Sequence, residues 1–472
     1  MKKKIPFVMI KYFNTFLVIL PFLVCWFAYY EPITMTTRSR QVSVLVIASY
    51  TIVFYWLCHH MDGFRSSILP LNELIFNQLI SIAITDVYAF ILIWMLSVNF
   101  PNVVPGLMAF LAQCLIVPLV CIYRYRSFNK SHPPLKALII RDVRDDIERL
   151  ITERELDGRF DVQGTLNSQE LLKNMDLLDG MDMVFIFGVH SQERNAILKE
   201  CIYRNVQLYI IPRVGDLLMN ATEEIHLFHL PILRSKRYNP TTEYRVIKRL
   251  VDIVISLIGL VILSPVFLVT AIAIKQDGGP VFYSQERLTQ NGKRFMILKF
   301  RSMRVDSEKE CGAVLSAGEN DPRITSVGRV IRAFRIDELP QLLNILKGDM
   351  SIVGPRPERP EIAAKYEETL PEFALRLQAK AGLTGYAQVY GKYNSTPYDK
   401  LLMDLLYLSH STLFQDMKII LETIRILFDK ESTEGVETPP NSGEYENDER
   451  YYGNNNHLHN KAGIHRKQSA SV

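Results

Sequence analysis

Four long apolar runs, separated by short polar segments, dominate the first 125 residues. They cover residues 12–30, 43–61, 79–100 and 104–123. Each run is long enough to cross a hydrocarbon core about 30 Å thick. The pattern therefore predicts four transmembrane helices over residues 1–125.

Basic residues at both ends of this region predict its orientation. Lysines at positions 2–4 precede the first run, and Arg124, Arg126, Lys130 and Lys136 follow the fourth. By the positive-inside rule, both ends of the bundle are expected in the cytoplasm. The first run lacks a small-residue cleavage site, so we interpret it as a retained anchor.

From residue 130 to 240, short β-rich runs alternate with helical ones. Strands are predicted at 136–140, 183–187 and 207–211, and helices at 145–155 and 192–205. This alternation is typical of a parallel sheet covered by helices. Dinucleotide binding would require glycines after the first strand, where the chain has Arg141-Asp142. We predict a degenerate Rossmann-like, CoA-binding-like domain with a structural or regulatory role, with nucleotide binding as the less favoured alternative.

Residues 248–275 form another apolar run, interrupted by Ser264 and Pro265. Proline inside a helix removes a backbone hydrogen bond and clashes with the preceding turn, so a kink is expected here. The run is long enough for a fifth crossing, but it also fits a broken, re-entrant helix that enters and leaves on one face.

Composition sets limits on the class of protein. The chain has 472 residues, 48% of them hydrophobic, and a formal net charge of +4. It is too long for a single core, and so small a charge gives no case for a nucleic-acid binder. The six cysteines show no C-x-x-C spacing and are expected to be reduced. The polar tail at 431–472 is predicted to be disordered.

Charged residues gather beside glycines and prolines in the C-terminal half. Lys299 and Arg301 occupy alternate positions, which places both cations on one side of an extended strand, where they suit phosphate binding. Arg356 lies between two prolines that hold its backbone rigid. Gln388 lies in a glycine-punctuated loop, and Asp404 and Asp416 follow it.

Asp337 and Glu338 are adjacent carboxylates that allow two readings. Asp337 fits a helix N-cap, with Pro340 in the first turn and Gly348 after the last, so both acids could be ordinary capping residues. However, Arg332 and neighbouring arginines precede them, and a positive site of this kind attracts phosphate. Carboxylates in such a site could bind Mg²⁺ or attack phosphorus, and we expect the positive surroundings to keep Asp337 ionised.

Several motifs in this order resemble the bacterial sugar transferase family, the polyprenyl-phosphate phosphoglycosyl transferases. They are Ser264-Pro265, Lys-Phe-Arg-Ser-Met at 299–303, Asp-Glu-Leu-Pro-Gln-Leu at 337–342, Val-Gly-Pro-Arg-Pro-Glu at 353–358 and Gly-Leu-Thr-Gly-Tyr-Ala-Gln-Val at 382–389. The resemblance covers about residues 245–430. The preceding spans and Rossmann-like domain look like the large members, such as undecaprenyl-phosphate glucose or galactose phosphotransferases. Ala381 departs from the proline that many members carry there.

The resemblance implies a function and roles for individual residues. A hexose-1-phosphate would pass from a UDP-sugar to undecaprenyl phosphate, starting exopolysaccharide or capsule synthesis. Asp337 would be the nucleophile, forming an aspartyl phosphosugar and releasing UMP. Lys299, Arg301, Arg332, Arg356 and Gln388 would bind phosphate or substrate, and Glu338, Asp404 and Asp416 would hold Mg²⁺.

Topology favours the re-entrant reading of residues 248–275, because a fifth crossing would place everything after Lys275 outside, where nucleotide sugars are scarce. The resemblance implies the same, since the family's catalytic part has a re-entrant helix broken at Ser-Pro. The predicted fold class is thus a mixed membrane protein: a four-helix transmembrane bundle, an α/β middle domain, and a monotopic α/β catalytic domain at 245–430. It would lie in the bacterial inner membrane, with the catalytic domain on the cytoplasmic face and a homodimer allowed.

Two alternatives stay open. An ordinary membrane glycosyltransferase would form a glycosidic bond and release the nucleoside diphosphate without a covalent intermediate. A non-catalytic scaffold of polysaccharide assembly would have no need of Asp337, Glu338, Lys299 and Arg356 together.

Overall fold

The computed structural model describes residues 7–34, 39–65, 69–97, 99–131, 133–142, 159–227, 229–235, 237–276, 278–304, 323–391 and 395–427. The chain divides into two compact units, residues 1–211 and 212–472. The tail predicted to be disordered lies outside the described residues.

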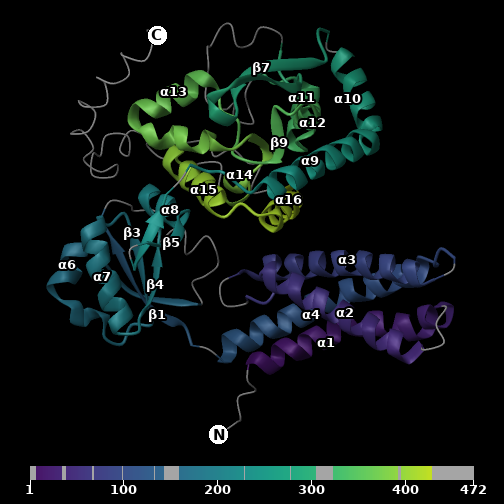
Figure 1. Cartoon of the computed structure of the whole chain (residues 1–472), viewed down its shortest axis with the longest axis horizontal. Helices are drawn as coiled ribbons and strands as arrows, with labels where there is room; N and C mark the ends of the chain where they lie inside the picture. The colour runs from purple at the N-terminus through teal and green to yellow at the C-terminus, as the bar shows by residue number, and fades with distance from the viewer. Residues whose placement is uncertain are drawn as a thin grey trace. The chain divides into compact units, whose positions relative to one another are not determined.

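A bundle of long helices forms the first part of the first unit (Figure 1). Its members are α1 (Phe7–Cys25), α2 (Ser39–His60), α3 (Leu71–Leu96) and α4 (Val104–Ser131), and α1 continues through the short turns Trp26–Tyr30 and Glu31–Ile33. Within the described residues, these four helices are individually long and apolar enough to cross a membrane. The four apolar runs predicted from the sequence are therefore confirmed as helices.

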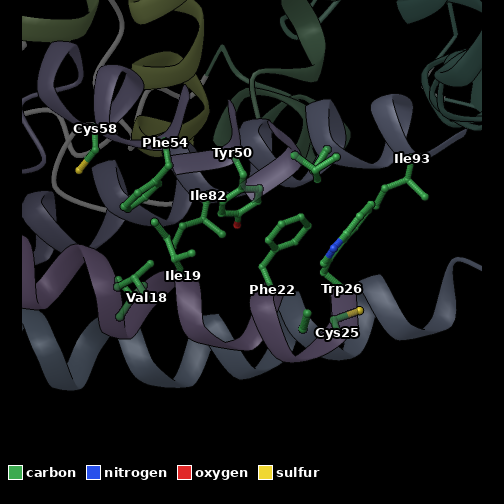
Figure 2. Close-up of a cluster of buried hydrophobic side chains, with 14 of the residues drawn as sticks. Val18, Ile19, Phe22, Cys25, Trp26, Tyr50, Phe54, Cys58, Ile82 and Ile93 are labelled. Atoms are coloured by element: carbon green, nitrogen blue, oxygen red, sulfur yellow. The ribbon is translucent and has the colours of Figure 1, made fainter. Parts of the chain in front are cut away.

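The bundle interior is an apolar cluster to which all four helices contribute (Figure 2). Phe22 of α1 stacks on Tyr50 of α2, with ring centroids 3.8 Å apart. Large apolar side chains such as Leu45 and Leu115 remain exposed on the outside. Helices that are apolar all round suit a lipid environment. The Tyr50 hydroxyl also donates to Asp86 Oδ1 at 2.6 Å, so Asp86 serves helix packing.

A four-stranded parallel sheet follows the bundle in the first unit. Its strands β1 (Leu135–Arg141), β2 (Phe160–Leu166), β3 (Met183–Phe187) and β4 (Gln207–Ile210) are ordered β2-β1-β3-β4. The described connections include α6 (Ser168–Lys173), Met175–Leu178 and α7 (Ser191–Tyr203). Three strands and α7 match the prediction, β2 was not predicted, and the helix predicted at 145–155 lies outside the described residues.

The second unit begins earlier than the boundary expected at residue 240. Helix α8 (Val214–Asn220) and the antiparallel hairpin of β5 (Glu223–Leu227) and β6 (Leu230–Arg234) belong to it. Helix α8 packs against α15 (Pro397–Ser409), which ties this segment to the C-terminal half.

Two small sheets and several helices build the rest of the second unit. Strands β7 (Phe282–Leu288) and β8 (Arg294–Phe300) pair antiparallel, while β9 (Met350–Val353) and β10 (Ala381–Thr384) pair parallel. The helices and turns are α9 (Thr242–Ile262), α10 (Ser264–Gln276), Gln290–Gly292, α11 (Ser326–Ala333), Ile336–Glu338, α12 (Gln341–Lys347), α13 (Pro360–Thr369), Pro371–Gln378, α14 (Tyr386–Tyr390) and α16 (Leu413–Leu427).

Helices α9 and α10 meet at a bend of 61°. The Ser264 hydroxyl donates to the Val261 carbonyl at 2.7 Å, so the serine supplies a donor at the break, as its position predicted. Val261, Ile262, Leu268 and Val269 around the bend are exposed. An exposed apolar patch of this kind marks an interaction surface.

Candidate functional site

Asp337 and Glu338 lie in a 3-10 turn that joins α11 to α12. Arg335, just before the turn, has left-handed backbone dihedrals (φ 52°, ψ 21°), which are uncommon for a non-glycine residue. The predicted N-cap role of Asp337 is wrong, because α12 begins at Gln341 and Pro340 occupies the cap position with no side-chain cap bond. Gly348 does end α12 with φ 99°, as predicted. The capping interpretation therefore does not account for the two acids.

Cations from two other segments contact Glu338. Lys299 Nζ, from β8, lies 3.3 Å from Glu338 Oε1, and Arg356 Nη2, from the loop after β9, lies 3.5 Å from the same oxygen. The Glu338 side chain is 15% exposed, so these charges interact where solvent screens them weakly. The structure thus brings Lys299, Arg356 and Glu338 together, as the sequence predicted.

The two adjacent acids have opposite pKa shifts. Burial raises the pKa of Asp337 above its ordinary value; Lys299 and Arg332 oppose that rise and Glu338 adds to it. Burial would also raise the pKa of Glu338, but Lys299, Arg356 and Arg335 outweigh it and lower that pKa to about 2. The positive surroundings that were expected to keep Asp337 ionised do not dominate there, because burial raises the pKa of Asp337; the cations dominate only at Glu338. Environments that separate the pKa values of neighbouring acids are typical of catalytic pairs.

Asp404 is held in a buried ion pair. Arg376 Nε and Nη2 lie 2.8 and 2.7 Å from Asp404 Oδ2, and the side chains of Arg376 and Asp404 are 2% and 1% exposed. Arg376 Nη2 also donates to the Arg356 carbonyl at 3.0 Å. Asp404 is therefore placed behind the Arg356 loop, where its carboxylate stabilises a buried guanidinium.

Asp416 is likewise surrounded by donors. It accepts hydrogen bonds from Tyr244 and Tyr407 at 2.8 and 2.7 Å, and Lys248 Nζ lies 2.7 Å from its Oδ2. These contacts join the start of α9 to α15 and α16. In the described part of the chain, no three His, Cys, Asp or Glu side chains gather as a metal site. The structure therefore does not group Glu338, Asp404 and Asp416, and their joint role as metal ligands stays a prediction.

Arg301 and Gln388 differ in their surroundings. Arg301 is buried, and its Nη2 donates to the Ile274 carbonyl at 3.1 Å, so it ties the end of α10 to the end of β8. Gln388 Nε2 donates to the Leu383 carbonyl at 3.0 Å, while its buried Oε1 has no hydrogen-bond partner among the described residues. A substrate role for either residue stays a prediction.

Arg376 and Lys248 are the functional candidates that sequence reasoning missed. Arg376 lies in the turn Pro371–Gln378, outside every motif that carried the family resemblance. No local signal identifies it, because its partners Asp404 and Arg356 are 28 and 20 residues away along the chain. Lys248 stands at the start of the apolar run 248–275, and its partner Asp416 is 168 residues away along the chain.

The loop that carries Arg356 packs against the glycine-rich segment 382–385. A Cβ placed on Gly382 would lie 2.2 Å from the Gly354 nitrogen, and one on Gly385 would lie 2.1 Å from the Gly354 oxygen. The neighbouring Ala381 N–H donates to Thr289 Oγ1 at 3.1 Å, a bond that the proline of many family members could not make. The Ala381 departure therefore adds an anchor to this segment.

We expect Gly382→Ala to lower the stability of the second unit. The added methyl would meet backbone atoms of Gly354 and Thr384, which cannot swing aside as the end of a flexible side chain can. Overpacking of this kind costs roughly 1–3 kcal/mol. Thermal unfolding of the full chain measures the effect. Gly215→Ala in α8 is the matched control, since nothing lies within 4 Å of its added Cβ; equal melting temperatures for the two variants would contradict the close approach.

Comparison with known proteins finds relatives of the C-terminal half of the chain. The family model for bacterial sugar transferases matches residues 243–430. A UDP-N-acetylgalactosamine-undecaprenyl-phosphate N-acetylgalactosaminephosphotransferase of Aeromonas hydrophila is 36% identical over 239 residues, which cover 50% of this chain and 55% of that protein. An undecaprenyl-phosphate galactose phosphotransferase of Salmonella typhimurium is 35% identical over 234 residues, or 46% of this chain and 48% of that one.

A third relative is matched over more of its own length. The UDP-glucose:undecaprenyl-phosphate glucose-1-phosphate transferase of Caulobacter vibrioides is 42% identical over 184 residues, covering 38% of this chain and 68% of that protein. By contrast, the chain spans about half the length of the Aeromonas and Salmonella relatives. The residues matched by the family model, 243–430, include Asp337, Glu338, Lys299 and Arg356. The chain belongs to the bacterial sugar transferase family.

Proposed function

We propose that this protein transfers a hexose-1-phosphate from a UDP-sugar to undecaprenyl phosphate, releasing UMP, as a first membrane step of exopolysaccharide or capsule synthesis. The names of the relatives support the reaction class. The observation that carries the proposal is the convergence of Lys299 and Arg356 on the Asp337-Glu338 pair, where both cations lie within 3.5 Å of Glu338. Such a cluster suits a diphosphate substrate better than a neutral one.

The proposed reaction has two displacement steps at one phosphorus atom. In the first, an Asp337 carboxylate oxygen attacks the β-phosphorus of the UDP-sugar, and the bond from that phosphorus to the bridging oxygen breaks. UMP leaves with that oxygen and its electron pair. In the second, an oxygen of ionised undecaprenyl phosphate attacks the same phosphorus, the aspartyl P–O bond breaks, and the Asp337 carboxylate is restored. No proton transfer is required when both nucleophiles are ionised.

The cations have separate parts in this scheme. Lys299 lies beside Glu338, and its charge also acts on Asp337, so it favours the ionised nucleophile. Arg356 presents a guanidinium that can grip phosphate oxygens through two parallel hydrogen bonds. Arg332 acts on Asp337 from the last turn of α11. Together they oppose the charge that collects on the phosphate oxygens as UMP leaves.

Mg²⁺ is part of the proposal. Proteins usually hold this ion through one or two carboxylates together with substrate phosphates and water, so the Glu338 carboxylate beside the proposed nucleophile fits that mode. Glu338 is suited to the task because its lowered pKa keeps it ionised at neutral pH. When bound, the ion would neutralise phosphate oxygens.

A direct test uses the full-length protein in detergent with a UDP-sugar labelled with ³²P at the β-position and with Mg²⁺. We expect label on the protein and release of UMP, followed by transfer of the label to added undecaprenyl phosphate. Release of UDP without a protein adduct would instead support the ordinary glycosyltransferase. Failure to turn over any UDP-hexose would support the scaffold.

The donor sugar needs its own experiment. The relatives named above are assigned to N-acetylgalactosamine, galactose and glucose, so their names do not converge on one sugar. A panel of these UDP-sugars, read by UMP release, would rank the donors by kcat/KM.

The pH dependence of UMP release should follow the ionisation of the Asp337 carboxyl group. Because only the carboxylate attacks and the pKa of Asp337 is raised, the rate should already fall at a pH above the usual range for aspartate. Lys299→Met removes the strongest charge opposing that rise, so the acid limb should move to higher pH. Lys347→Met is the control, since Lys347 is largely exposed and pairs with Asp349. A profile unchanged by Lys299→Met would contradict the assigned role.

We also propose that the bent pair α9–α10 is a re-entrant membrane hairpin. Both ends of the pair contact the same body: Arg249 of α9 donates to the carbonyls of Ile345 and Leu346 at 2.6 and 2.7 Å, and the Ile274 carbonyl of α10 accepts from Arg301. A crossing helix would have to carry these contacts to opposite faces of the bilayer. The catalytic face would be cytoplasmic, in the inner membrane of a bacterium.

Topology can be measured with inserted tags in whole cells. A tag at Gly279, just after α10, should react only after the cytoplasm is opened. A tag in segment 35–38, between α1 and α2, is the control and should react from outside. If the Gly279 tag reacts in intact cells, the hairpin reading is wrong.

The parallel sheet of the first unit supports the Rossmann-like assignment of the middle domain. Its order β2-β1-β3-β4 is compatible with such a fold, and its first strand runs into Arg141-Asp142 in place of a glycine-rich turn. We therefore propose a structural or regulatory role for this domain. Formation of a homodimer stays a prediction.

A further inference from the structure

A buried arginine at one end of the helix bundle lacks a counter-charge. Arg124, near the end of α4, is 1% exposed. Its Nη2 donates to the Gly63 carbonyl at 2.8 Å, but its Nε and Nη1 have no hydrogen-bond partner among the described residues. Burying an unpaired charge carries a large desolvation cost, which an anionic ligand would offset.

Asn14 of α1 adds a second unsatisfied group beside this arginine. Its side chain is buried, and neither Oδ1 nor Nδ2 finds a partner within the described chain. Asn14 and Arg124 line a cavity of about 240 Å³ between α1 and α4. The rest of its wall is apolar and includes Leu17, Leu119 and Val120. The cavity surface is therefore almost entirely hydrocarbon, and the polar groups of Asn14 and Arg124 lie buried in its wall.

A second cation lies close to the same end of the bundle. Lys11 Nζ lies 4.5 Å from the centroid of the Phe64 ring, and Arg124 Cζ lies 5.7 Å from that centroid. No carboxylate in the described ranges pairs with Lys11 or Arg124. Both cations thus lie against the Phe64 ring at this end of the bundle.

The depth of Arg124 places this cluster at the level of lipid headgroups if the bundle crosses a bilayer. Twenty residues separate it from the start of α4 at Val104. At 1.5 Å per residue this is about 30 Å, roughly the thickness of the hydrocarbon core. Basic pockets between transmembrane helices at this level bind the phosphates of anionic lipids.

We propose that Arg124 and Asn14 bind the phosphate of an anionic membrane phospholipid, with an acyl chain lying along Leu17, Leu119 and Val120. The ionised phosphate accepts from Arg124 Nε and Nη1, and the Asn14 amide donates to the headgroup. The apolar wall favours a phosphate that carries a hydrocarbon chain over a free one. This site is separate from Asp337 and Glu338 and does not depend on the proposed reaction.

Native mass spectrometry of the full-length protein in detergent tests the site. Dioleoyl phosphatidylglycerol should bind at least about tenfold more tightly than dioleoylglycerol, which has the same chains without the phosphate. Arg124→Gln should remove that preference. Arg126→Gln is the matched control, because Arg126 is an exposed cation two residues further along α4. Equal binding of phosphatidylglycerol to the wild type and Arg124→Gln would overturn the proposal.

A second variant and two other ligands distinguish loss of the site from loss of the fold and identify the kind of ligand. If Arg124→Gln does not fold, Leu119→Trp should block the acyl chain while keeping the charge, and undiminished lipid binding to that variant would also overturn the proposal. Tighter, Arg124-dependent binding of a polyprenyl phosphate would show that the ligand is a different lipid. Displacement of phosphatidylglycerol by millimolar inorganic phosphate would show that the site recognises free phosphate.

Discussion

Asp337→Asn should abolish both the labelled protein adduct and the release of UMP. An amide at this position lacks the charged oxygen that would attack phosphorus, while Lys299, Arg356 and Glu338 remain in place. Removal of a covalent nucleophile lowers kcat by about 10⁴-fold or more, because the residual binding groups contribute far less alone. The ³²P assay measures the adduct and UMP in the same reaction.

The same substitution should not harm the fold, and that contrast makes the test specific. The folded state raises the pKa of Asp337, so it binds the proton more tightly than the unfolded chain does. Stability from this group is therefore gained as pH falls and is lost as pH rises through the raised pKa. At neutral pH the ionised side chain is destabilising, and Asp337→Asn should melt at the same or a slightly higher temperature.

Asp349→Asn is the matched control. It makes the same chemical change 12 residues away, at a carboxylate that pairs with the exposed Lys347 at 3.1 Å. It should retain the adduct and near-normal UMP release. A labelled adduct on Asp337→Asn would move the nucleophile to another residue. Loss of activity accompanied by a large drop in melting temperature would indicate that the substitution disrupts the fold.

The sequence predicted the parts of the site that depend on local spacing. Lys299 at the end of a strand and Arg356 between prolines were assigned to phosphate binding from sequence alone, and both lie within 3.5 Å of Glu338. The four apolar runs and the parallel strands were also predictable, because hydrophobic periodicity directly reflects burial. These features depend on residues that are close together in the sequence.

Features that depend on distant partners were not predictable. Asp404 and Asp416 were expected beside Glu338, but one contacts Arg376 and the other contacts Lys248 and two tyrosines. The sequence around a carboxylate in a charged segment does not show whether its side chain binds a metal ion or a buried cation. The capping role given to Asp337 was wrong for a different reason: the left-handed Arg335 and a 3-10 turn delay α12 until Gln341, and no glycine marks that turn.

Arg376→Met should cause the largest loss of stability among the substitutions considered. It leaves the 1% exposed Asp404 carboxylate buried without its guanidinium partner. Breaking a buried pair from one side costs roughly 3–5 kcal/mol, which corresponds to a fall in melting temperature of about 10 °C for a unit of this size. Thermal unfolding of the full chain, followed for the second unit, measures this shift.

The double variant Arg376→Met/Asp404→Leu separates stability from catalysis. Replacing both charges with apolar groups of similar volume removes the uncompensated carboxylate, so most of the lost melting temperature should return. Activity should not return to the same extent, because the Arg356 carbonyl still lacks the hydrogen bond at 3.0 Å from Arg376 Nη2 that fixes the phosphate-binding loop. A raised KM for the UDP-sugar in a stably folded double variant would identify Arg376 as a positioning residue.

If the double variant recovers both stability and KM, the pair serves only the fold. If it melts as low as Arg376→Met alone, the unpaired charge is not the cause of the instability.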